Sequence, residues 1–589
     1  MQTGPEFEYK QRLETRRAAT AKLEARHRTM GNLKLLDAGL ALGVLWLRAG
    51  WWWLSAPAAA FVALLVVHER VLRALGNARR AEAFYQRGLD RIADRWSGTG
   101  ESGARFEDPS HPYAADLDLF GSGGLFQLLN NCRTRAGEDA LARWLKEPAA
   151  AEEARERQEA VAELRGRIDL REDLALLGED AGAGVHAAEL AAWAAQPPVL
   201  ASRRARLIAP LLAGLFVVTF GGWLWGGWPL SLVAAALALE VAYFLPLRAR
   251  VAQVSAAVDE PSRDLDLLAQ VLVRLENEEF ACPRLRRLRA ALDTGGVPAS
   301  RRIAQLDRRM ELLDSRDHLL MRVVGPPLLW TTQLALAVEA WRLRHGQSAG
   351  RWLEAVGEME ALSSLAAYSF EHPGDPFPEL TEAGPFFHGD GLAHPLLPAA
   401  RAVRNDVRLD RDHALLLVSG SNMSGKSTLL RTVGVNTVLA LAGAPVRAGS
   451  LTLSPMAAGG SIRIHDSLQA GTSRFYAEVL RIRQMVELAE RGPLLFLLDE
   501  LLHGTNSHDR RIGAGAILRT LLERGAIGLA TTHDLALSGI VEELAPRAEN
   551  VHFADEIEDG RITFDYRMRP GVVTKSNALE LMRSVGLDV

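Results

Sequence analysis

The sequence predicts a multidomain protein with α-helical transmembrane hairpins, a helical core and a C-terminal α/β domain with a mainly parallel sheet. Three observations predict this fold class: two long apolar stretches, helical periodicity around them, and a change near residue 385 to short apolar runs that alternate with helical segments. The chain has 589 residues, which is too long for one hydrophobic core. Its net charge of -4 lacks the strongly basic balance that is usual for a nucleic-acid-binding domain.

The two apolar stretches are residues 35–67 and 207–247. Because a helix needs about 20 residues to cross a bilayer, each stretch is too long for one span and about right for two. Each breaks at a short tip, and tryptophans, which favour the membrane–water interface, stand beside both tips. These residues are Trp51, Trp52, Trp53, Trp223, Trp225 and Trp228. The sequence therefore predicts two helical hairpins, with four spans in all.

The charges around the hairpins predict their orientation. Arginines and lysines precede and follow both hairpins, whereas the tips hold only Arg48. By the positive-inside rule, both termini and every large segment face the cytoplasm, at the cytoplasmic membrane. The alternative is that both hairpins are buried in a soluble core. Asp37 and Glu240 favour this alternative because intramembrane acids are costly.

Residues 113–200 and 251–370 have apolar residues at helical spacing, so we expect helices there. A third apolar patch, residues 323–338, is interrupted by Pro326 and Pro327, and we expect a buried helix and not a span. An arginine cluster on a predicted helix either contacts phosphates or forms a solvated face. Its members are Arg284, Arg286, Arg287 and Arg289.

A nucleotide site is predicted where an apolar strand, residues 414–418, is followed by a glycine-rich loop and a helical pattern. Gly420, Gly425, Lys426 and Ser427 have the spacing of a P-loop, whose backbone N–H groups surround phosphate. Lys426 is expected to reach the β- and γ-phosphates of ATP, and Ser427 to bind Mg²⁺. The whole predicted ATP-binding loop is Gly420, Ser421, Asn422, Met423, Ser424, Gly425, Lys426, Ser427 and Thr428.

Two carboxylates complete the predicted site, because the apolar run 494–498 ends in Asp499 and Glu500. In sites of this kind the first carboxylate helps to hold Mg²⁺. The second is placed to orient or deprotonate the attacking water. His533 follows the strand-like run 527–532, from which it could sense the γ-phosphate, although such a residue alone is more often a capping residue. Together these motifs predict a P-loop ATPase domain.

These motifs resemble those of the MutS family of DNA mismatch-repair ATPases over residues 385–589. The loop GSNMSGKST is similar to the loop of that family, and GTSRFYAEV supplies Ser473, Phe475 and Glu478 at its next motif. LDELLHGTNSHD is similar to the motif that carries the two carboxylates, and residues 574–587 resemble the closing helix–turn–helix region. The matching residues of the carboxylate motif are Asp499, Glu500, Gly504, Thr505, Ser507 and Asp509.

The resemblance implies an ABC-like fold for the ATPase domain and a core and lever for the helical segments. Residues 116–148 are similar to the start of that core, but the family's mismatch-recognition domain and clamp are not evident, so mismatch recognition does not transfer. Where the family places an aromatic residue against adenine, the nearest candidates are Val403 and Arg404. The predicted segments are an N-terminal helix (1–34), hairpin 1 (35–67), the first core and lever segment (68–206), hairpin 2 (207–247), the second core and lever segment (248–370) and the ATPase domain (371–589).

The resemblance also implies a homodimer. Ser473, Phe475 and Glu478 would form a signature that acts across the subunits, and the loop with Gly504, Thr505, Ser507 and Asp509 would lie at the dimer interface. ATP would close the two ATPase heads, and hydrolysis through Glu500 would release them.

Two functions remain open from the sequence. The first is a membrane-anchored MutS-like ATPase that couples ATP binding and hydrolysis to DNA binding, in mismatch repair or recombination. The second is a membrane mechanoenzyme of MutS descent that has no DNA role and acts on an unknown protein partner. A transporter is disfavoured because the signature segment is not of the transporter type.

Overall fold

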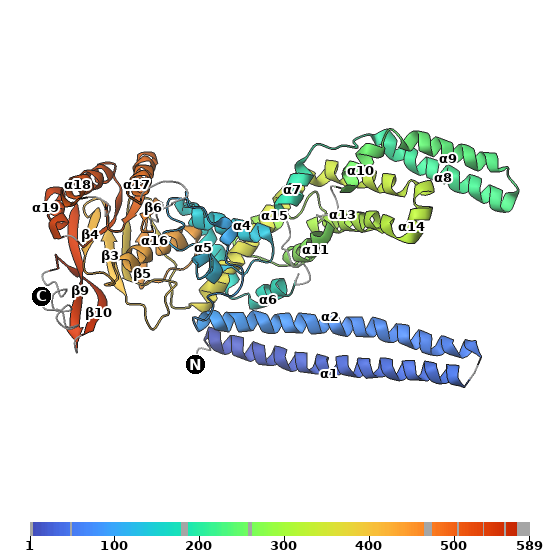
Figure 1. Cartoon of the computed structure of the whole chain (residues 1–589), viewed down its shortest axis with the longest axis horizontal. Helices are drawn as coiled ribbons and strands as arrows, with labels where there is room; N and C mark the ends of the chain where they lie inside the picture. Colours follow the sequence, from blue (N-terminus) through green and yellow to red (C-terminus); the bar gives the residue numbers. More distant parts are fainter. Residues whose placement is uncertain are drawn as a thin grey trace. The chain divides into compact units, whose positions relative to one another are not determined.

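The computed structural model describes residues 4–47, 50–177, 187–256, 262–463, 474–502, 506–533, 535–558 and 561–573 (Figure 1). The chain divides into two compact units. Unit 1 comprises Met1–Asn130, Leu141–Ile168 and Leu362–Val589, and unit 2 comprises Asn131–Ala140 and Asp169–Ala361. A multidomain, largely helical chain with one α/β domain is therefore confirmed.

Unit 1 contains the long N-terminal helices and all the described strands. Its helices are α1 (Pro5–Trp46), α2 (Ser55–Ile92), α3 (Leu125–Leu129), α5 (Ala151–Arg165), α16 (Lys426–Ala442), α17 (Arg474–Arg491), α18 (Ser507–Glu523) and α19 (Ile540–Leu544). Its strands are β1 (Glu379–Leu380), β2 (Phe387–Leu392), β3 (Asn405–Leu409), β4 (Leu415–Ser419), β5 (Ser450–Leu453), β6 (Ala457–Ser461), β7 (Leu494–Leu498), β8 (Ile527–Thr532), β9 (Ala548–Glu558) and β10 (Arg561–Pro570).

The described part of unit 2 is helical. It holds α7 (Ala187–Ala195), α8 (Arg203–Gly226), α9 (Leu230–Phe244), α10 (Arg248–Ala256), α11 (Ser262–Glu276), α12 (Pro283–Ala291), α13 (Ala299–Asp314) and α14 (Leu319–Val324). Short 3₁₀ turns, η3 (Ser315–Asp317) and η4 (Pro326–Leu328), flank α14. The boundary between the units falls within three helices, which are α4 (Arg135–Lys146), α6 (Ile168–Leu176) and α15 (Trp330–Glu371).

Two sheets form the α/β domain. The larger has the order β10-β9-β4-β8-β7-β6, and every pairing in it is parallel except that of β9 with β10. The smaller has the order β1-β5-β2-β3. β4, β7 and β8 are buried along their whole length, as the continuous apolar runs predicted. The mainly parallel sheet is therefore confirmed.

The segment before α3 packs onto this domain. Asp116 is buried and accepts hydrogen bonds from the backbone N–H groups of Ile462 (2.8 Å) and Arg463 (2.6 Å), just after β6. Burial raises the pKa of Asp116, and these two hydrogen bonds oppose that rise. Leu117 lies against Gly434 of α16, where a Cβ atom would approach the leucine side chain to 2.5 Å. The helical segment and the sheet therefore share one core.

A buried ion pair joins α2 to the end of α15 within unit 1. The Arg91 guanidinium donates to both carboxylate oxygens of Glu371, at 2.7 and 2.6 Å, and the Tyr9 hydroxyl donates to the same carboxylate at 3.3 Å. Tyr9 also packs in the groove that Gly88 leaves on α2, where a Cβ atom would approach the tyrosine ring to 2.4 Å. Each of these three polar side chains comes from a different helix, so their contacts fix the base of the α1–α2 hairpin.

The interior of unit 2 combines tryptophans with buried acids. Trp341 and Trp352 are among the largest fully buried side chains. Glu360 accepts a hydrogen bond from the Thr134 hydroxyl at 2.6 Å and from the Thr134 N–H at 3.1 Å. Burial raises the pKa of Glu360 to about 7, although the hydrogen bonds from Thr134 favour its charged form.

The four predicted spans are not supported. Among the described residues, one helix, α8, is long and apolar enough to cross a membrane. A second span is obtained only if α9 and α10 are counted as one, and they are bent by 66° at their junction. In the first hairpin, the apolar runs 35–47 and 55–67 are each only about 20 Å long at about 1.5 Å per residue, and charged residues follow outside them. That length is shorter than the hydrocarbon core of about 30 Å.

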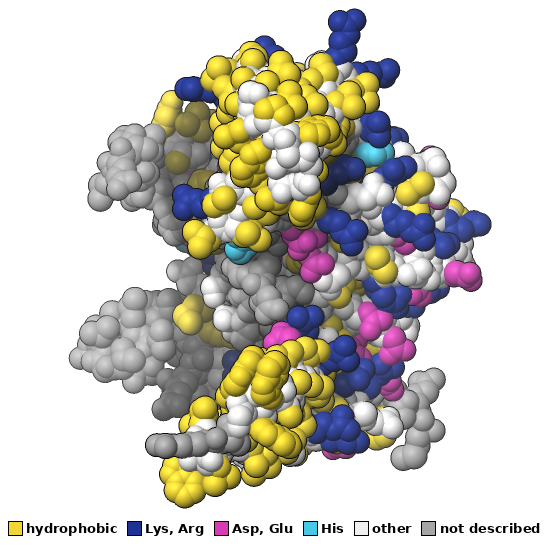
Figure 2. Space-filling model, turned by 90° about the vertical axis from the view of Figure 1, so that its right-hand side faces the viewer, with side chains coloured by type: hydrophobic (Ala, Val, Ile, Leu, Met, Phe, Trp, Pro, Cys, Tyr) yellow, Lys and Arg dark blue, Asp and Glu magenta, His cyan; other side chains and the backbone are white. Residues whose placement is uncertain are grey.

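The predicted hairpin topology is nevertheless observed in both places. α1 and α2 form one hairpin and α8 and α9 form another. Figure 2 shows hydrophobic side chains gathered over the ends of both hairpins. Trp46 is 83% exposed and Trp225 is 84% exposed, so the apolar surface includes residues beside both tips.

The prediction of one buried helix over residues 323–338 is wrong in its first part. The chain breaks at η4, where Pro326 and Pro327 lack backbone N–H donors, and α15 begins only at Trp330. Leu319, Leu320 and Val323 of α14 are exposed, whereas Leu336 and Val338 of α15 are buried.

The Arg91–Glu371 pair gives a first prediction. Arg91→Met leaves a buried carboxylate without its cation, which costs about 3–5 kcal/mol. We expect faster hydrogen–deuterium exchange at the bases of α1 and α2. The double variant Arg91→Met/Glu371→Met is the matched control, because it removes both charges and is expected to restore most of the protection. Unchanged exchange in Arg91→Met would show that the pair does not hold the hairpin.

Candidate nucleotide-binding site

The predicted P-loop joins the buried strand β4 to α16. Gly420 (φ +150°) and Gly425 (φ +103°) both adopt positive φ values that favour glycine. A Cβ atom at Gly420 would lie 3.0 Å from the Phe553 carbonyl oxygen and 2.9 Å from Ser424 Oγ. The loop therefore turns tightly, and its close packing requires glycine. The sheet order places β4 between β8 and β9, so the loop emerges from the middle of the larger sheet.

Lys426 is the first residue of α16 and is 5% exposed. Its Nζ donates to the backbone carbonyls of Gly420 (2.8 Å) and Ser421 (2.7 Å). Burial lowers the pKa of Lys426, while the negative charges of Glu500 and Asp499 oppose this shift. The site thus holds a desolvated cation at a helix N-terminus, where the helix dipole adds positive potential.

The loop also holds polar atoms that suit an anionic ligand. Ser421 Oγ and Ser424 Oγ are buried and have no hydrogen-bond partner within the described part of the protein. Buried hydroxyls are normally paired, so these two groups keep hydrogen-bonding capacity that a water or a ligand can use. With the α16 N-terminus, they form a group of donors that fits phosphate.

The two predicted carboxylates follow β7. The Thr531 hydroxyl donates to Asp499 Oδ1 at 2.5 Å and accepts from the Glu500 N–H at 2.9 Å, so one side chain of β8 positions both residues. Glu500 has a positive φ of +51°, which is uncommon for a residue with a side chain. His533 Nδ1 lies 3.6 Å from Glu500 Oε1. His533, the predicted sensor of the γ-phosphate, is therefore next to Glu500, the predicted base for the attacking water.

The predicted magnesium ligands lie on two sides of this site. Ser427 is the second residue of α16 and lines the cavity, while Asp499 directly follows β7. Mg²⁺ is usually held by one or two protein oxygens together with phosphate and water. A serine hydroxyl and a carboxylate are therefore a sufficient protein contribution, and the residues present fit this ion.

Glu478 has a different environment from the one expected of a signature that acts across subunits. It is buried, and its Oε1 accepts a hydrogen bond from the Leu502 N–H at 2.7 Å. Glu478 thus supports the turn after Glu500 within its own chain. Phe475, in contrast, is 38% exposed on the first turn of α17.

Other predicted site residues are only partly described. Ser473, Gly504 and Thr505 lie outside the described residues. Ser507 begins α18, and Asp509 is exposed in the first turn, where its N–H donates to the N-cap residue Asn506 at 2.9 Å. The predicted helix–turn–helix region at 574–587 is also outside the described residues.

A cavity of about 860 Å³ adjoins the P-loop. It is lined by loop residues that include Asn422, Met423 and Lys426, by Glu500, and by three aromatic side chains. The aromatic residues are Phe553, Phe564 and Tyr566. Val403, one of the two candidates for an adenine contact, lines the cavity, but Arg404 does not and donates to the Gly391 carbonyl at 2.8 Å.

Tyr566 is the aromatic residue that sequence reasoning missed. Its ring lies against the loop, since a Cβ atom at Gly425 would be 3.1 Å from Tyr566 Cδ1. The pairing of β9 with β10 shifts register between Phe564 and Met568, and Tyr566 has a φ of +55°. Asn405 fixes this bulge by donating to the Tyr566 carbonyl (3.0 Å) and accepting from the Met568 N–H (2.7 Å).

A histidine also lines this cavity. His394 is buried, and the loss of solvation, together with the charge of Arg431, lowers its pKa to about 4. His394 is therefore neutral at physiological pH. It adds a polar but uncharged wall to a site whose lining carries the positive charges of Lys426 and Arg401.

A parallel sheet, a glycine loop before a helix and paired carboxylates at the neighbouring strand end define a P-loop nucleotide-binding domain. Residues 416–588 match the family model "MutS domain V". The match supports MutS family membership for this domain.

Curated relatives match less than half of the chain. The chain is 33% identical to "Endonuclease MutS2" of Thermus thermophilus over 247 residues, which are 42% of this chain and 32% of that protein. It is 30% identical to "DNA mismatch repair protein MutS" of Brevibacillus brevis over 276 residues, 46% of this chain and 32% of that protein. It is 32% identical to "DNA mismatch repair protein MutS 2" of Halobacterium salinarum, over 40% of this chain and 27% of that protein. The chain thus spans about a third of the length of these relatives.

The position of Tyr566 gives a second prediction. A base stacked on an aromatic ring gains about 1–3 kcal/mol, so Tyr566→Ala should raise the Kd for ATP by about 5- to 150-fold. Tyr566→Phe keeps the ring and should bind as the unaltered protein does. Titration with a fluorescent ATP analogue measures both. Equal affinity in the alanine variant would show that the ring does not contact the base.

Proposed function

We propose that this protein is a membrane-associated MutS-type ATPase that couples ATP binding and hydrolysis to DNA binding. The observation that carries the proposal is the cavity at the P-loop, which Lys426 and Glu500 both line, in a segment that matches MutS domain V. MutS proteins are ATPases, and the residues for that chemistry are present here.

The proposed chemistry is hydrolysis of the bond between the β- and γ-phosphates. Lys426 and the loop N–H groups bind the phosphate oxygens and offset their charge. Glu500 accepts a proton as water attacks the γ-phosphorus, and the bond to the bridging oxygen breaks to release ADP and phosphate. His533, 3.6 Å from Glu500, holds that carboxylate in position. Mg²⁺, held by Ser427 and Asp499, would neutralise charge on the phosphates when bound.

We propose a homodimer that closes through the ATPase domains. Exposed apolar side chains gather on α17 and on the neighbouring helix α18 and suit a protein interface. They are Phe475, Tyr476, Val479, Leu480 and Ile512. Ser473 would complete the partner's site, and the loop that carries Gly504, Thr505, Ser507 and Asp509 would lie at this interface. The Glu478 carboxylate would support it from inside.

Membrane association is proposed through the hairpin α8–α9 and the apolar end of α1–α2. Leu211, Val217 and Leu224 of α8 are exposed, as are Leu35, Leu40 and Leu45 of α1. A soluble protein rarely exposes so much contiguous apolar surface. The termini and the ATPase domain are proposed to face the cytoplasm at the cytoplasmic membrane, since basic residues flank both hairpins.

The second candidate function is a membrane mechanoenzyme without a DNA role. One observation favours it. The arginine cluster on α12 is partly engaged within the protein, because Arg284 pairs with Glu358 at 2.7 Å and Arg289 Nε donates to the Glu276 carbonyl at 3.0 Å. These arginines are therefore less available to phosphates than their sequence spacing suggested.

The catalytic assignment gives a third prediction. Glu500→Gln should bind ATP with unchanged affinity but hydrolyse it about 10²–10⁴-fold more slowly, since general base catalysis contributes that much. Lys426→Ala is the companion variant and should lose ATP binding itself. Turnover assays and nucleotide titrations on the purified full-length protein separate the two effects. Normal turnover in Glu500→Gln would place the base elsewhere.

A fourth prediction decides between the two functions. Detergent-purified protein should bind DNA with an affinity that falls as salt rises, because phosphate contacts release counterions. Binding to homoduplex, mismatched and branched DNA is measured with ADP and with ATP across a salt series. ATP-dependent binding supports the DNA-coupled ATPase. No binding at low salt, with ATP hydrolysis intact, would support the mechanoenzyme.

A further inference from the structure

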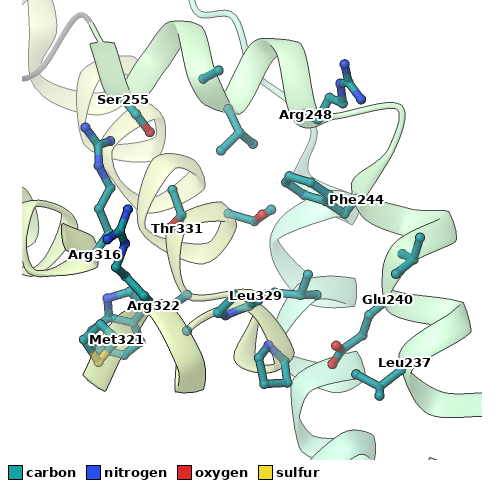
Figure 3. Close-up of a pocket in the computed structure, with 18 of the residues that line it drawn as sticks. Leu237, Glu240, Phe244, Arg248, Ser255, Arg316, Met321, Arg322, Leu329 and Thr331 are labelled. Carbon is teal, nitrogen blue, oxygen red and sulfur yellow. The ribbon is translucent and has the colours of Figure 1, made fainter. Parts of the chain in front are cut away.

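Unit 2 contains a separate cavity of about 710 Å³ (Figure 3). Its walls come from the end of α9, from α10 and from the segment that runs from η3 through η4 into α15. The cavity therefore lies at the base of the α8–α9 hairpin, where α9 ends and the chain bends by 66° into α10.

One end of the cavity is apolar. Leu237, Val241 and Phe244 line it from α9, and Leu329 lines it from the opposite segment. Leu237 and Glu240 lie at the far side of Figure 3 from Arg316 and Arg322. Such a wall suits a hydrocarbon chain, because burying apolar surface is favourable and needs no directed partner.

The other end is cationic. Arg316 and Arg322 line the cavity on this side, whereas Arg248, at the start of α10, lies across the cavity from them, nearer Phe244. The side chains of Arg248 and Arg322 have no ion-pair or hydrogen-bond partner among the described residues. Guanidinium groups bind phosphate through paired N–H donors, so this end suits a phosphate group.

Two buried polar atoms facing the cavity lack partners among the described residues. Ser255 is 5% exposed and its Oγ has no hydrogen bond, and Glu240 is 3% exposed with Oε1 unpaired. A buried polar group without a partner is costly, so a ligand atom that bonds the Ser255 hydroxyl would stabilise the site. Ser255 lies at the same end of Figure 3 as Arg316, whereas the acidic Glu240 lies at the other end, so an anionic group is favoured beside the arginines.

The surroundings place this cavity beside an apolar surface. Leu319, Leu320 and Val323 of α14 are 83%, 71% and 73% exposed. α14 adjoins η4, which also contacts α8. A ligand with both a hydrocarbon chain and a charged group would meet matching surfaces here, whereas a small soluble anion would leave the apolar end empty.

We propose that this cavity binds one anionic phospholipid, with its phosphate against Arg316, Arg322 and the Ser255 hydroxyl and with an acyl chain between α9 and Leu329. This lipid site rests on the proposed membrane association of the protein. It would give unit 2 a contact that is specific to one class of lipid. Binding would fix the bend between α9 and α10.

The test uses full-length protein reconstituted in phosphatidylcholine vesicles that contain a photoactivatable phosphatidylglycerol. Cross-links are mapped to peptides by mass spectrometry. We expect cross-links both in residues 207–226, which report hairpin contact with bulk lipid, and in residues 316–332, which report the cavity. Unlabelled phosphatidylglycerol should compete at the cavity, whereas phosphatidylcholine and free glycerol phosphate should not.

The variant Arg316→Gln/Arg322→Gln removes two cationic partners of the phosphate. The loss of even one charge-assisted hydrogen bond weakens binding about tenfold, so cavity cross-linking should fall by at least that factor. Arg203→Gln/Arg204→Gln is the matched control, with two arginines removed from the start of α8 outside the cavity lining, and should leave cavity cross-linking unchanged. ATP hydrolysis by each variant reports that the chain is folded.

Four outcomes would overturn the proposal. In the first two, the hairpin cross-links are present, and either both double variants label the cavity equally or phosphatidylcholine competes as well as phosphatidylglycerol. Each of these would show that the cavity is not an anionic lipid site, while membrane association stands. Competition by glycerol phosphate alone would identify a free phosphate ester as the ligand. Absence of cross-links in both segments would overturn membrane association together with the lipid site.

Discussion

A buried lysine ammonium is the constraint on which the nucleotide-binding domain depends. Lys426 lies at the start of α16 with its Nζ on two backbone carbonyls. Burial lowers its pKa, and the negative charges that oppose this shift come from the residues after β7. A cation in such a place is stable only when the surrounding backbone is held rigidly. The order of the sheet supplies that rigidity, because β4 is paired on both sides along its length.

Thr531 extends this arrangement to the carboxylates. One hydroxyl both accepts from the Glu500 N–H and donates to Asp499, so β8 fixes the position of residues that follow β7. The positive φ of Glu500 is tolerated because the neighbouring turn is also held, through Glu478 and the Leu502 N–H. Residues far apart in the sequence therefore place a single carboxylate beside the P-loop.

The sequence was sufficient for the parts of the site that are local in the chain. The P-loop and the pair Asp499 and Glu500 could be predicted because each motif couples a buried strand to a fixed turn chemistry. Tyr566 could not, because its place depends on a register shift between two antiparallel strands and on Asn405 from a third. Glu478 was expected to act across subunits, yet its burial depends on the packing of α17, which the motif does not encode.

The helical region was less predictable for a different reason. The length of the apolar stretches and the tryptophans beside their tips suggested four spans, but the apolar runs in α1 and α2 end too soon to cross a bilayer, and the helices continue as charged segments. Likewise, residues 323–324 were assigned to a buried helix, although their exposure depends on the break that Pro326 and Pro327 impose. Length and periodicity define helices well, but they do not define which face meets protein.

The pairing of Arg91 with Glu371 also has a consequence for synthesis of the chain. The two residues are 280 positions apart, so the hairpin base has no partner until most of the protein has been made. At about 5–20 residues per second, translation of that interval takes on the order of 15–60 s. Throughout this time the nascent chain presents the apolar arms of α1 and α2 without the contact that later holds them. The order of the segments therefore makes early delivery of the hairpin to an apolar environment an advantage over waiting for the nucleotide-binding domain to fold.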